Sequence, residues 1–359
     1  MVLRDYLADF GGRDWQEIEE GTVRIAAIGL GWWTRDEAIP AIQNGDLCET
    51  TVVVSGSIEK ADRVAAEVET VEAAITYEDF HDGAAVDAYD AVYICTPNAT
   101  HLEYVETAAE LGKAILCEKP MEATVEAAEK IVEAADAANV PLMIAYRMQT
   151  EPAIRRAKEL VQDGFIGEPL QVHGHMADDI LTLAGGPDQW RLDPELSGGT
   201  TVNDIGIYPI NTTRFVLEED PVAVYGRTRW EHEAFEGLDE HAAFQLEFES
   251  GLEAACTVSH NAHQTSHLRF IGTEGELTVE PIFFPWDDRE LVLRHGDSRG
   301  EIRFEQVDQM EEEFDYFGQC VLTGADPYPD GRHGLIDMQV IAAIYESAES
   351  GERIELEYG

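Results

Sequence analysis

Basic residues are scarce in this sequence. Its 359 residues include 24 Lys+Arg against 72 Asp+Glu, which gives a formal net charge of −48 at pH 7. Recognition of a nucleic-acid backbone needs clustered Lys and Arg, so the composition argues against a nucleic-acid partner. A patch for a basic partner would concentrate the acidic residues in one segment, whereas here they are spread along the chain. The composition therefore predicts a solvating surface suited to a salt-rich cytoplasm.

The sequence also lacks long apolar runs and paired cysteines. No apolar stretch approaches the roughly 18 residues of a membrane-spanning helix, and the first residues do not have the pattern of a signal peptide. The five cysteines are widely spaced and form no Cys-x-x-Cys pair. Disulfide frameworks and zinc ribbons use cysteines at regular spacings. We therefore expect reduced core thiols in a cytoplasmic protein with no membrane partner.

The length predicts more than one domain. Single hydrophobic cores stop growing at about 250–300 residues, and 44% of this chain is hydrophobic, enough for a core in each of two domains. Near the N-terminus, Leu3, Leu7 and Phe10 have helical spacing. We expect an N-terminal arm in residues 1–21, a nucleotide-binding domain in residues 22–145, and a substrate-binding α+β domain in residues 146–359 whose last helix packs back.

An apolar segment followed by two glycines marks the start of the nucleotide-binding domain. Residues 23–28 predict a buried strand that runs into Gly29-Leu30-Gly31-Trp32-Trp33-Thr34. This is a Gly-x-Gly-x-x-Gly pattern with Thr34 in place of the third glycine, which only eases helix packing. Because the pattern follows a strand and precedes a helix, it predicts a cofactor loop containing Gly29, Gly31, Trp32 and Trp33.

The end of the next expected strand, residues 51–54, favours NADP over NAD. An NAD-binding fold usually carries Asp or Glu at this point, about 20 residues after the glycines, to bind the ribose 2′-hydroxyl. This chain has Ser55 and Ser57 there, with Lys60 nearby. Two hydroxyls and a cation suit a 2′-phosphate. The alternative for Lys60 is an exposed residue that opens the following helix.

Two further strand ends carry polar side chains. The strand expected at residues 90–95 is followed by Thr96, Pro97 and Asn98, which can contact the ribose and nicotinamide of a cofactor. His101 comes next, and we expect it to begin a helix near the site rather than to act as a base.

The strand expected at residues 114–116 leads through Cys117 into Glu118 and Lys119, directly before a proline. A charge at that point lies at the carboxyl edge of the sheet, where doubly wound α/β proteins bind their ligands. With a last strand at residues 141–145, the pattern predicts a parallel sheet of five or six strands alternating with helices.

From residue 146 onward the pattern changes to alternating segments, such as residues 243–248. These predict a large open sheet of mostly antiparallel strands, one face of which needs a cover. We therefore expect a homo-oligomer, either a dimer or a tetramer. Before them, two glycines introduce a helix in which Asp204 and Tyr208 stand four residues apart and project from one face. A structural Tyr–Asp pair explains this spacing as well as a catalytic pair does.

Several histidines raise the alternative of a metal site. His173 and His175 share one strand face, and His263 and His267 share another, with His260 close by in the sequence. No pair comes with the carboxylate and spacing of a helical metal site, so we expect surface or pocket-lining imidazoles and no metal.

Together these motifs resemble the glucose–fructose oxidoreductase, inositol dehydrogenase and rhizopine catabolism (Gfo/Idh/MocA) superfamily. Many members carry His where this chain has Tyr208, and tyrosine there is most similar to the glucose–fructose oxidoreductase branch. The resemblance covers nearly the whole chain from Val23 and rests on the glycine loop, Cys117-Glu118-Lys119-Pro120, Trp190-Arg191 ahead of Gly198-Gly199, and Asp204-x-Gly206-x-Tyr208.

The resemblance implies an NADP-dependent oxidoreductase that oxidises an aldose at C1 to an aldonolactone, with D-xylose as the first candidate. Tyr208 would take the proton of the anomeric hydroxyl, Lys119 would favour the phenolate, and Asp204 would bind a sugar hydroxyl or orient the lysine. Glu118 and Lys119 would also contact the cofactor. The expected wall of the substrate pocket consists of Arg147, Trp190 and Arg191. Another aldose, an inositol or a trans-dihydrodiol remains an alternative substrate, and a silent NADP-binding regulator is an alternative function.

Overall fold

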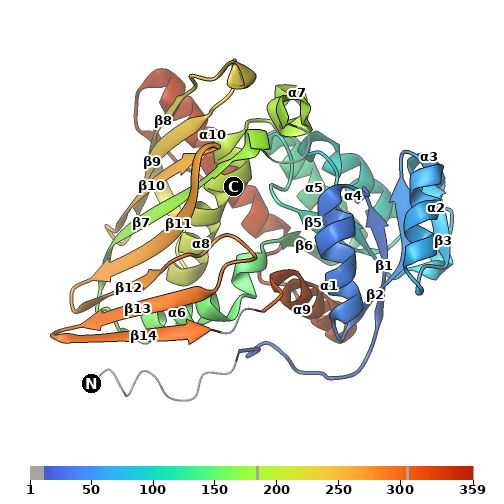
Figure 1. Ribbon diagram of the computed structural model, residues 1–359, viewed down its shortest axis with the longest axis horizontal. Helices are drawn as coiled ribbons and strands as arrows, with labels where there is room; N and C mark the ends of the chain where they lie inside the picture. The colour runs from blue at the N-terminus through green and yellow to red at the C-terminus, as the bar shows by residue number, and fades with distance from the viewer. Residues whose placement is uncertain (1–11, 183–185, 305–306, 359) are drawn as a thin grey trace. The chain divides into compact units, whose positions relative to one another are not determined.

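The computed structural model describes residues 12–182, 186–304 and 307–358 of the protein. These residues form two compact units, and Figure 1 shows the elements of each. Of the described residues, the parallel-sheet unit contains those in Trp15–Arg147 and Asp308–Leu335, and the mixed-sheet unit contains residues 12–14 and those in Met148–Val307 and Ile336–Gly359. The helical spacing expected of Leu3, Leu7 and Phe10 lies outside the described residues.

The sheet of the parallel-sheet unit has the strand order β3-β2-β1-β4-β5-β6 within the described ranges, and every pairing in it is parallel. The prediction of a parallel sheet of five or six strands is confirmed. This is the order of a doubly wound dinucleotide-binding fold, whose switch point lies at the carboxyl ends of β1 and β4. The strands are β1 (Val23–Ile28), β2 (Cys48–Ser55), β3 (Ala73–Thr76), β4 (Ala91–Ile94), β5 (Ala114–Glu118) and β6 (Leu142–Ala145).

Helices connect these strands. Their sequences form helices that bury one apolar face, as α5 shows. In α5 (Val125–Ala138), Thr124 caps the first turn by accepting a hydrogen bond from the Ala127 amide, and Asn139 ends the helix in the left-handed conformation. Ile131 and Val132 are among its buried residues, and each such side chain stabilises the fold by about 1.5–3 kcal/mol. The other helices of this unit are α1 (Ile39–Asn44), α2 (Ile58–Glu67), α3 (Tyr77–His81), α4 (His101–Glu110) and α9 (Gln309–Thr323).

Helix α9 comes from near the end of the chain and completes this unit. Its Phe314 is fully buried and meets Tyr93 of β4 edge to face, with ring centroids 5.1 Å apart. Phe317 belongs to the same core cluster, together with Ile25 of β1 and Leu116 of β5. Residues distant in the sequence thus share one hydrophobic core.

The mixed-sheet unit contains a sheet of order β14-β13-β12-β11-β7-β10-β9-β8-β15 within the described ranges. Only the pairing of β7 with β10 is parallel among its registers, which confirms the predicted large and mostly antiparallel sheet. The strands are β7 (Pro169–Asp179), β8 (Pro221–Arg229), β9 (His241–Phe248), β10 (Glu253–Ser259), β11 (Asn261–Gly272), β12 (Gly275–Val279), β13 (Arg289–His295), β14 (Ser298–Phe304) and β15 (Ile354–Glu355).

Helices cover one face of this sheet. Figure 1 shows α8 (Ile207–Leu217) and α10 (Gly331–Ser350) on the same side of it. A Cβ at Gly174 of β7 would lie 2.9 Å from Pro209 of α8, and one at Gly226 of β8 would lie 2.5 Å from the Ile344 carbonyl of α10. Burial along β9 and β10 alternates accordingly between covered and exposed side chains. Helices α6 (Pro152–Gln162) and α7 (Pro194–Ser197) also belong to this unit, and α6 contacts β12 and β13.

A buried ion pair joins α8 to α10. The Arg214 guanidinium, 1% exposed, lies 2.6 Å from the fully buried carboxylate of Asp337 and 2.7 Å from Asp220. Asn211 donates to the same Asp337 carboxylate at 2.7 Å, and the Gln149 amide donates to Asn211 at 2.9 Å. These contacts determine how two helices pack beneath the sheet.

All five cysteines are free thiols, four of them buried, namely Cys48, Cys117, Cys256 and Cys320. Within the described part of the chain, no helix combines the length and apolar character needed to cross a membrane.

We expect the free energy of unfolding to rise with KCl concentration. The acidic side chains of α5, such as Glu129 and Glu133, are exposed, and repulsion within a net charge of −48 destabilises the compact state at low ionic strength. The Debye length falls from about 10 Å at 0.1 M salt to about 3 Å at 1 M. Thermal unfolding followed by circular dichroism across a KCl series measures this. Sucrose, which stabilises without screening, is the control, and a melting temperature indifferent to KCl would contradict the expectation.

Candidate active site

The glycine loop after β1 has a backbone that only glycine allows. Gly29 has φ +90°, and a Cβ there would lie 2.2 Å from the Cys95 carbonyl oxygen. The Gly29 amide donates to the Val54 carbonyl at 3.0 Å, which ties the loop to β2. A Cβ at Gly31 would meet no atom within 4 Å. The loop is therefore held by its neighbours at Gly29 and is open at Gly31.

Thr34 replaces the third glycine with a useful hydrogen bond. Its fully buried hydroxyl donates to the Gly29 carbonyl at 2.6 Å. Trp32 is 36% exposed and meets Trp33 edge to face at 5.4 Å. The Thr34 side chain therefore bonds the start of the following helix to the turn at Gly29.

The end of β2 carries a group of hydroxyls and cations. Ser55 is buried and accepts a hydrogen bond from the Ser57 amide at 3.3 Å, and Ser57 caps α2 and donates to Glu59 at 2.9 Å. The pKa of Lys60 is lowered by partial burial and then by the charges of Arg35 and Arg63.

Arg35 and Arg63 are two residues that the sequence interpretation missed. Their effect on Lys60 places three cations at this strand end. Arg63 stands three residues after Lys60 in α2, a spacing that puts both on one helix face. That spacing was a usable signal, whereas nothing in the sequence indicated that Arg35 would approach from the glycine loop.

The turn after β4 is held to the turn after β5 by His101. This residue begins α4, as predicted, and its ring is fully buried. Nε2 lies 3.0 Å from the Thr96 carbonyl and Nδ1 lies 3.2 Å from the Met121 carbonyl. Of the residues between, Thr96 and Pro97 are half-buried and Asn98 is buried. The imidazole therefore fixes two loops relative to each other.

Glu118 links the end of β5 to the glycine loop. Its Oε1 accepts hydrogen bonds from the Tyr93 hydroxyl at 2.7 Å and from Trp33 Nε1 at 3.2 Å. Its Oε2 accepts from the Lys119 amide at 3.1 Å. Burial raises the pKa of Glu118, and the Lys119 charge opposes that rise. Three predicted cofactor residues, Trp33, Glu118 and Lys119, are thus brought together.

Arg147 lies among carboxylates in the same unit. It is 5% exposed and its Nη1 donates to the Gln309 amide oxygen. Its charge lowers the pKa of both Glu118 and Glu313. Burial nevertheless holds the pKa of Glu313 well above its usual range, with the nearby Glu118 adding to the rise. The Arg147 charge thus partly offsets the effect of burial on the pKa values of Glu118 and Glu313.

In the mixed-sheet unit, Asp239 holds the start of the helix that carries Asp204 and Tyr208. Its carboxylate accepts from the Thr200 amide at 2.8 Å, the Val202 amide at 2.7 Å and the Tyr345 hydroxyl at 3.0 Å. Gly199 has φ +140°, and a Cβ there would lie 2.4 Å from the Tyr345 hydroxyl. The predicted glycine pair thus allows the chain to turn against Tyr345 into the helix.

Asp204 lies in a π-helical turn, η9 (Val202–Gly206), directly before α8. Its Oδ2 accepts from Arg191 Nε at 2.9 Å, and the Arg191 guanidinium lies 4.6 Å from the Trp190 ring centroid. Three residues predicted to bind substrate are therefore neighbours. Tyr208 is half-buried in the first turn of α8 and packs on Phe283 at 5.6 Å.

His260 is the second neighbour of Asp204. Its Nε2 lies 3.4 Å from Asp204 Oδ2, and its Nδ1 lies 2.6 Å from Asp178 Oδ1. Burial alone would lower the pKa of His260, but hydrogen bonds to and charges of the two aspartates outweigh it and raise the pKa to about 9. The sequence interpretation considered His260 as a metal ligand and favoured a surface or pocket-lining imidazole, and it missed this buried arrangement.

The remaining histidines lie on strands of the mixed sheet. His175 and His267 stack at 5.5 Å, and His173 is exposed. His263 lines a pocket of about 340 Å³. Among the described residues, no group of three or more His, Cys, Asp or Glu side chains is arranged to hold a metal ion.

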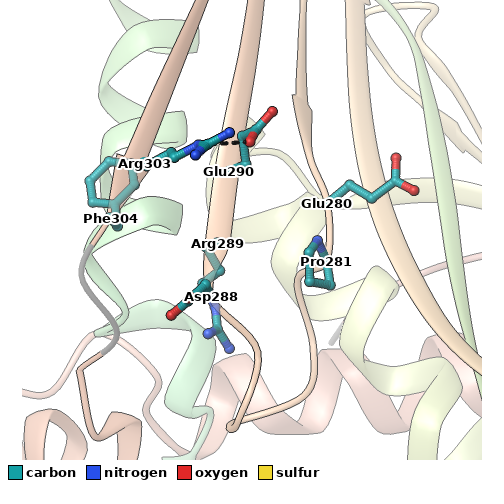
Figure 2. Close-up of a pocket in the computed structure, with 7 residues that line it drawn as sticks. All are labelled: Glu280, Pro281, Asp288, Arg289, Glu290, Arg303 and Phe304. Atoms are coloured by element: carbon teal, nitrogen blue, oxygen red, sulfur yellow. Dashed lines mark hydrogen bonds and ion pairs between the residues drawn. The ribbon is translucent and has the colours of Figure 1, made fainter.

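A larger pocket, of about 520 Å³, contains none of the predicted residues among those that line it. Figure 2 shows Arg303 and Glu290 of neighbouring strands β14 and β13 paired across its upper part, with Arg303 Nε 3.1 Å from Glu290 Oε2. Arg289 is the buried member of this lining. The predicted residues are therefore not associated with this pocket.

Two family models match successive parts of this chain. Residues 23–146 match the oxidoreductase family model with an NAD-binding Rossmann fold, and residues 154–278 match the GFO/IDH/MocA C-terminal domain. The chain belongs to the GFO/IDH/MocA oxidoreductase family. This confirms the predicted family and the predicted two-part fold.

Individual proteins are similar to this chain over nearly their full length. The D-xylose 1-dehydrogenase [NADP(+)] of Haloarcula marismortui is 61% identical over 97% of this chain and 98% of its own length. The D-xylose 1-dehydrogenase (NADP(+)) 2 of Haloferax volcanii is 32% identical over 94% and 99%. Among solved structures, aldose-aldose oxidoreductase from Caulobacter crescentus in complex with glycerol has a TM-score of 0.87 at 30% identity, covering 93% of this chain and all of that one.

Proposed function

We propose that this protein is an NADP-dependent D-xylose 1-dehydrogenase that converts the sugar to its aldonolactone. The observation that carries the proposal is the similarity, at 61% identity and nearly full length, to a protein of that activity from Haloarcula marismortui. The second relative with the same substrate and cofactor, at 32% identity, supports it.

The parallel-sheet unit fits NADP in its chemistry. Gly29 allows the tight turn, and Gly31 is open, so that a pyrophosphate can approach the backbone there. Ser55, Ser57, Lys60 and Arg35 provide hydroxyls and cations for a 2′-phosphate. We assign the nicotinamide ribose to Thr96, Pro97, Asn98 and Lys119, with Trp32, Trp33 and Glu118 around it and His101 holding the turn in place.

The reaction removes a hydride from C1 and a proton from the hydroxyl on C1, and the C1–O bond becomes the lactone carbonyl. NADP, when bound, accepts the hydride. Tyr208 takes the proton on its phenolic oxygen. A phenol with an ordinary pKa of about 10 needs assistance near neutrality, and Lys119 supplies a positive charge that favours the phenolate and polarises the sugar oxygen. Asp204 accepts a hydrogen bond from a sugar hydroxyl, with Trp190 and Arg191 beside it.

The shape of the pocket, rather than the hydride and proton transfer, selects the substrate. The test therefore includes other substrates. Initial rates of NADPH and NADH formation are measured in molar KCl with D-xylose, D-glucose, L-arabinose and myo-inositol supplied separately. NADPH formation fastest with D-xylose is expected. Turnover of inositol with NAD would contradict both the substrate and the cofactor, and NADP binding without any turnover would favour a regulator.

Lys60→Ala is expected to raise the KM for NADP about tenfold or more while leaving the KM for NAD unchanged. A hydrogen bond to a charged group contributes about 1.5–3 kcal/mol, and each 1.4 kcal/mol is a factor of about ten in affinity. Both constants are measured at one fixed KCl concentration. Lys130→Ala, at an exposed position of α5, is the matched control. Equal effects on both cofactors would contradict the assignment of the 2′-phosphate.

The exposed face of the mixed sheet supports a homo-oligomer. Tyr225, Val222 and Leu170 on its strands are between 37% and 45% exposed, which suits burial against a second copy. Light scattering in molar KCl distinguishes monomer, dimer and tetramer. The free thiols and acidic surface are consistent with a salt-rich cytoplasm as the location.

A further inference from the structure

A single buried imidazole lies between two carboxylates from separate segments of the mixed-sheet unit. His260 follows β10 and is 1% exposed. Asp178, near the end of β7, lies 2.6 Å from Nδ1, and Asp204, in η9, lies 3.4 Å from Nε2. The His260 amide donates to the Glu240 carbonyl at 3.0 Å, and its own carbonyl accepts from the Ile180 amide at 3.0 Å. The ring is therefore anchored by its backbone on both sides.

Nδ1 lies at hydrogen-bond distance from one carboxylate and Nε2 lies near a second, which favours the charged form of the ring. A neutral imidazole has one N–H, whereas an imidazolium has two. The two carboxylates are partly buried, and without a cation between them their like charges would repel each other. The geometry therefore stabilises an imidazolium at His260.

The other charged groups near the His260 ring, Arg191 and Glu240, bind partners other than the ring. Arg191 pairs with Asp204 at 2.9 Å, on the Oδ2 atom that also faces His260. The Glu240 carboxylate, in the loop before β9, accepts from the Glu231 and His232 amides and from Asn261. Asp178 and Asp204 are thus the carboxylates that face the ring.

Asp178 also lines the pocket of about 340 Å³, together with Asn261, Phe284 and Trp286. Phe284 and Trp286 stack at 5.6 Å, and Trp286 is 54% exposed. A carboxylate and an amide beside an exposed aromatic face can bind hydroxyl groups and the apolar face of a small polyol. His260 thus connects this pocket to Asp204.

We propose that His260 is a positioning residue: its imidazolium fixes the carboxylates of Asp178 and Asp204 so that both accept hydrogen bonds from hydroxyls of the sugar. This inference rests on the proposed function and adds to it Asp178 and His260, which are outside the residues assigned above. Raising the pH through about 9 deprotonates the ring and removes one of its two N–H donors. One carboxylate then loses its contact with a ring N–H, so sugar affinity is present below that pH and falls above it. The contribution to folding stability has the same sign, being complete below the ordinary histidine pKa of about 6.5 and lost through about 9.

The test compares wild-type enzyme with His260→Gln over a range of pH. We expect the variant to raise the KM for D-xylose about tenfold or more, to change kcat much less, and to leave the KM for NADP unchanged. The wild-type KM should rise above pH 9, and this rise should be absent in the variant. His241→Gln, which removes an imidazole bonded to Ser259 at 2.8 Å, is the matched control. A variant with unchanged KM and unchanged pH profile overturns the proposal.

Two further measurements keep the test decisive if His260→Gln does not fold. Asp178→Asn keeps the shape of the partner and removes its charge, and we expect it to raise the KM and to move the pH profile to lower pH. Imidazole NMR signals of the wild-type protein report the charge of His260 directly, and a ring that is neutral at pH 8 overturns the proposal. Absence of turnover with every polyol contradicts the proposed function, whereas turnover unaffected by these substitutions contradicts only the present inference.

Discussion

Tyr208→Phe is expected to lower kcat for aldose oxidation by about 10²–10⁴-fold, the usual contribution of a positioned general base. The substitution removes the phenolic oxygen that takes the proton and leaves the ring that packs on Phe283 at 5.6 Å. Affinity for NADP should be unchanged, because the residues assigned to the cofactor lie in the parallel-sheet unit. Steady-state rates with D-xylose and a fluorescence titration with NADPH measure the two quantities.

Tyr225→Phe is the matched control for this variant. Tyr225 lies on β8 in the same unit and is 42% exposed, so loss of its hydroxyl should leave kcat unchanged. If Tyr208→Phe retained wild-type turnover, the protein would use another base. If it lost NADP binding together with turnover, the loss would reflect misfolding rather than proton transfer.

Asp337→Ala is expected to lower the free energy of unfolding of the mixed-sheet unit by about 3–5 kcal/mol, as happens when one partner of a buried ion pair is removed. Arg214 would remain buried and keep the partly exposed Asp220 as a carboxylate partner, and Asn211 would lose the acceptor of its amide. Urea denaturation at constant KCl measures the change, because urea, unlike guanidinium, adds no ionic strength.

Asp136→Ala provides the comparison for this stability change. Asp136 pairs with Arg332 at 2.6 Å, but the two side chains are 57% and 70% exposed. An exposed pair contributes about 0–1 kcal/mol. Similar losses in the two variants would mean that burial does not govern the strength of the Arg214 pair.

Local sequence patterns located five strands of the parallel sheet and its loops, whereas β3 (Ala73–Thr76) was not located. The located strands contain short apolar runs and end where glycines or polar residues begin, so the positions of Gly29, Ser55 and Lys119 follow from the pattern itself. Parallel strands place their carboxyl ends on one edge. The predicted mostly antiparallel sheet followed in the same way from alternation, because one covered face makes every second residue buried.

Contacts between segments distant in the chain could not be predicted. Asp178, Asp204 and His260 come from three segments, and no local period connects them. Arg35 reaches the neighbourhood of Lys60 only because the glycine loop and α2 follow adjacent strands. The same limit applies to α9, whose apolar face gave no indication that Phe314 would pack on Tyr93 of a strand more than 200 residues earlier.

Neighbouring groups hold Lys119 and Asp204 in place. Within each unit, the structure shows supported side chains: Glu118 accepts from the Lys119 amide, and Asp204 is held by Arg191 and His260. Such support is what a site needs to keep its groups in place during a reaction.

The most direct test of the account uses D-xylose deuterated at C1. The protein is incubated in molar KCl with NADP and the labelled sugar, and the reduced cofactor and the sugar product are analysed by mass spectrometry. Transfer of the C1 hydride predicts one deuterium in the reduced nicotinamide and an unlabelled aldonolactone. Reduced cofactor without deuterium would show that oxidation takes place at another carbon, and the assignment of the reaction to C1 would be wrong.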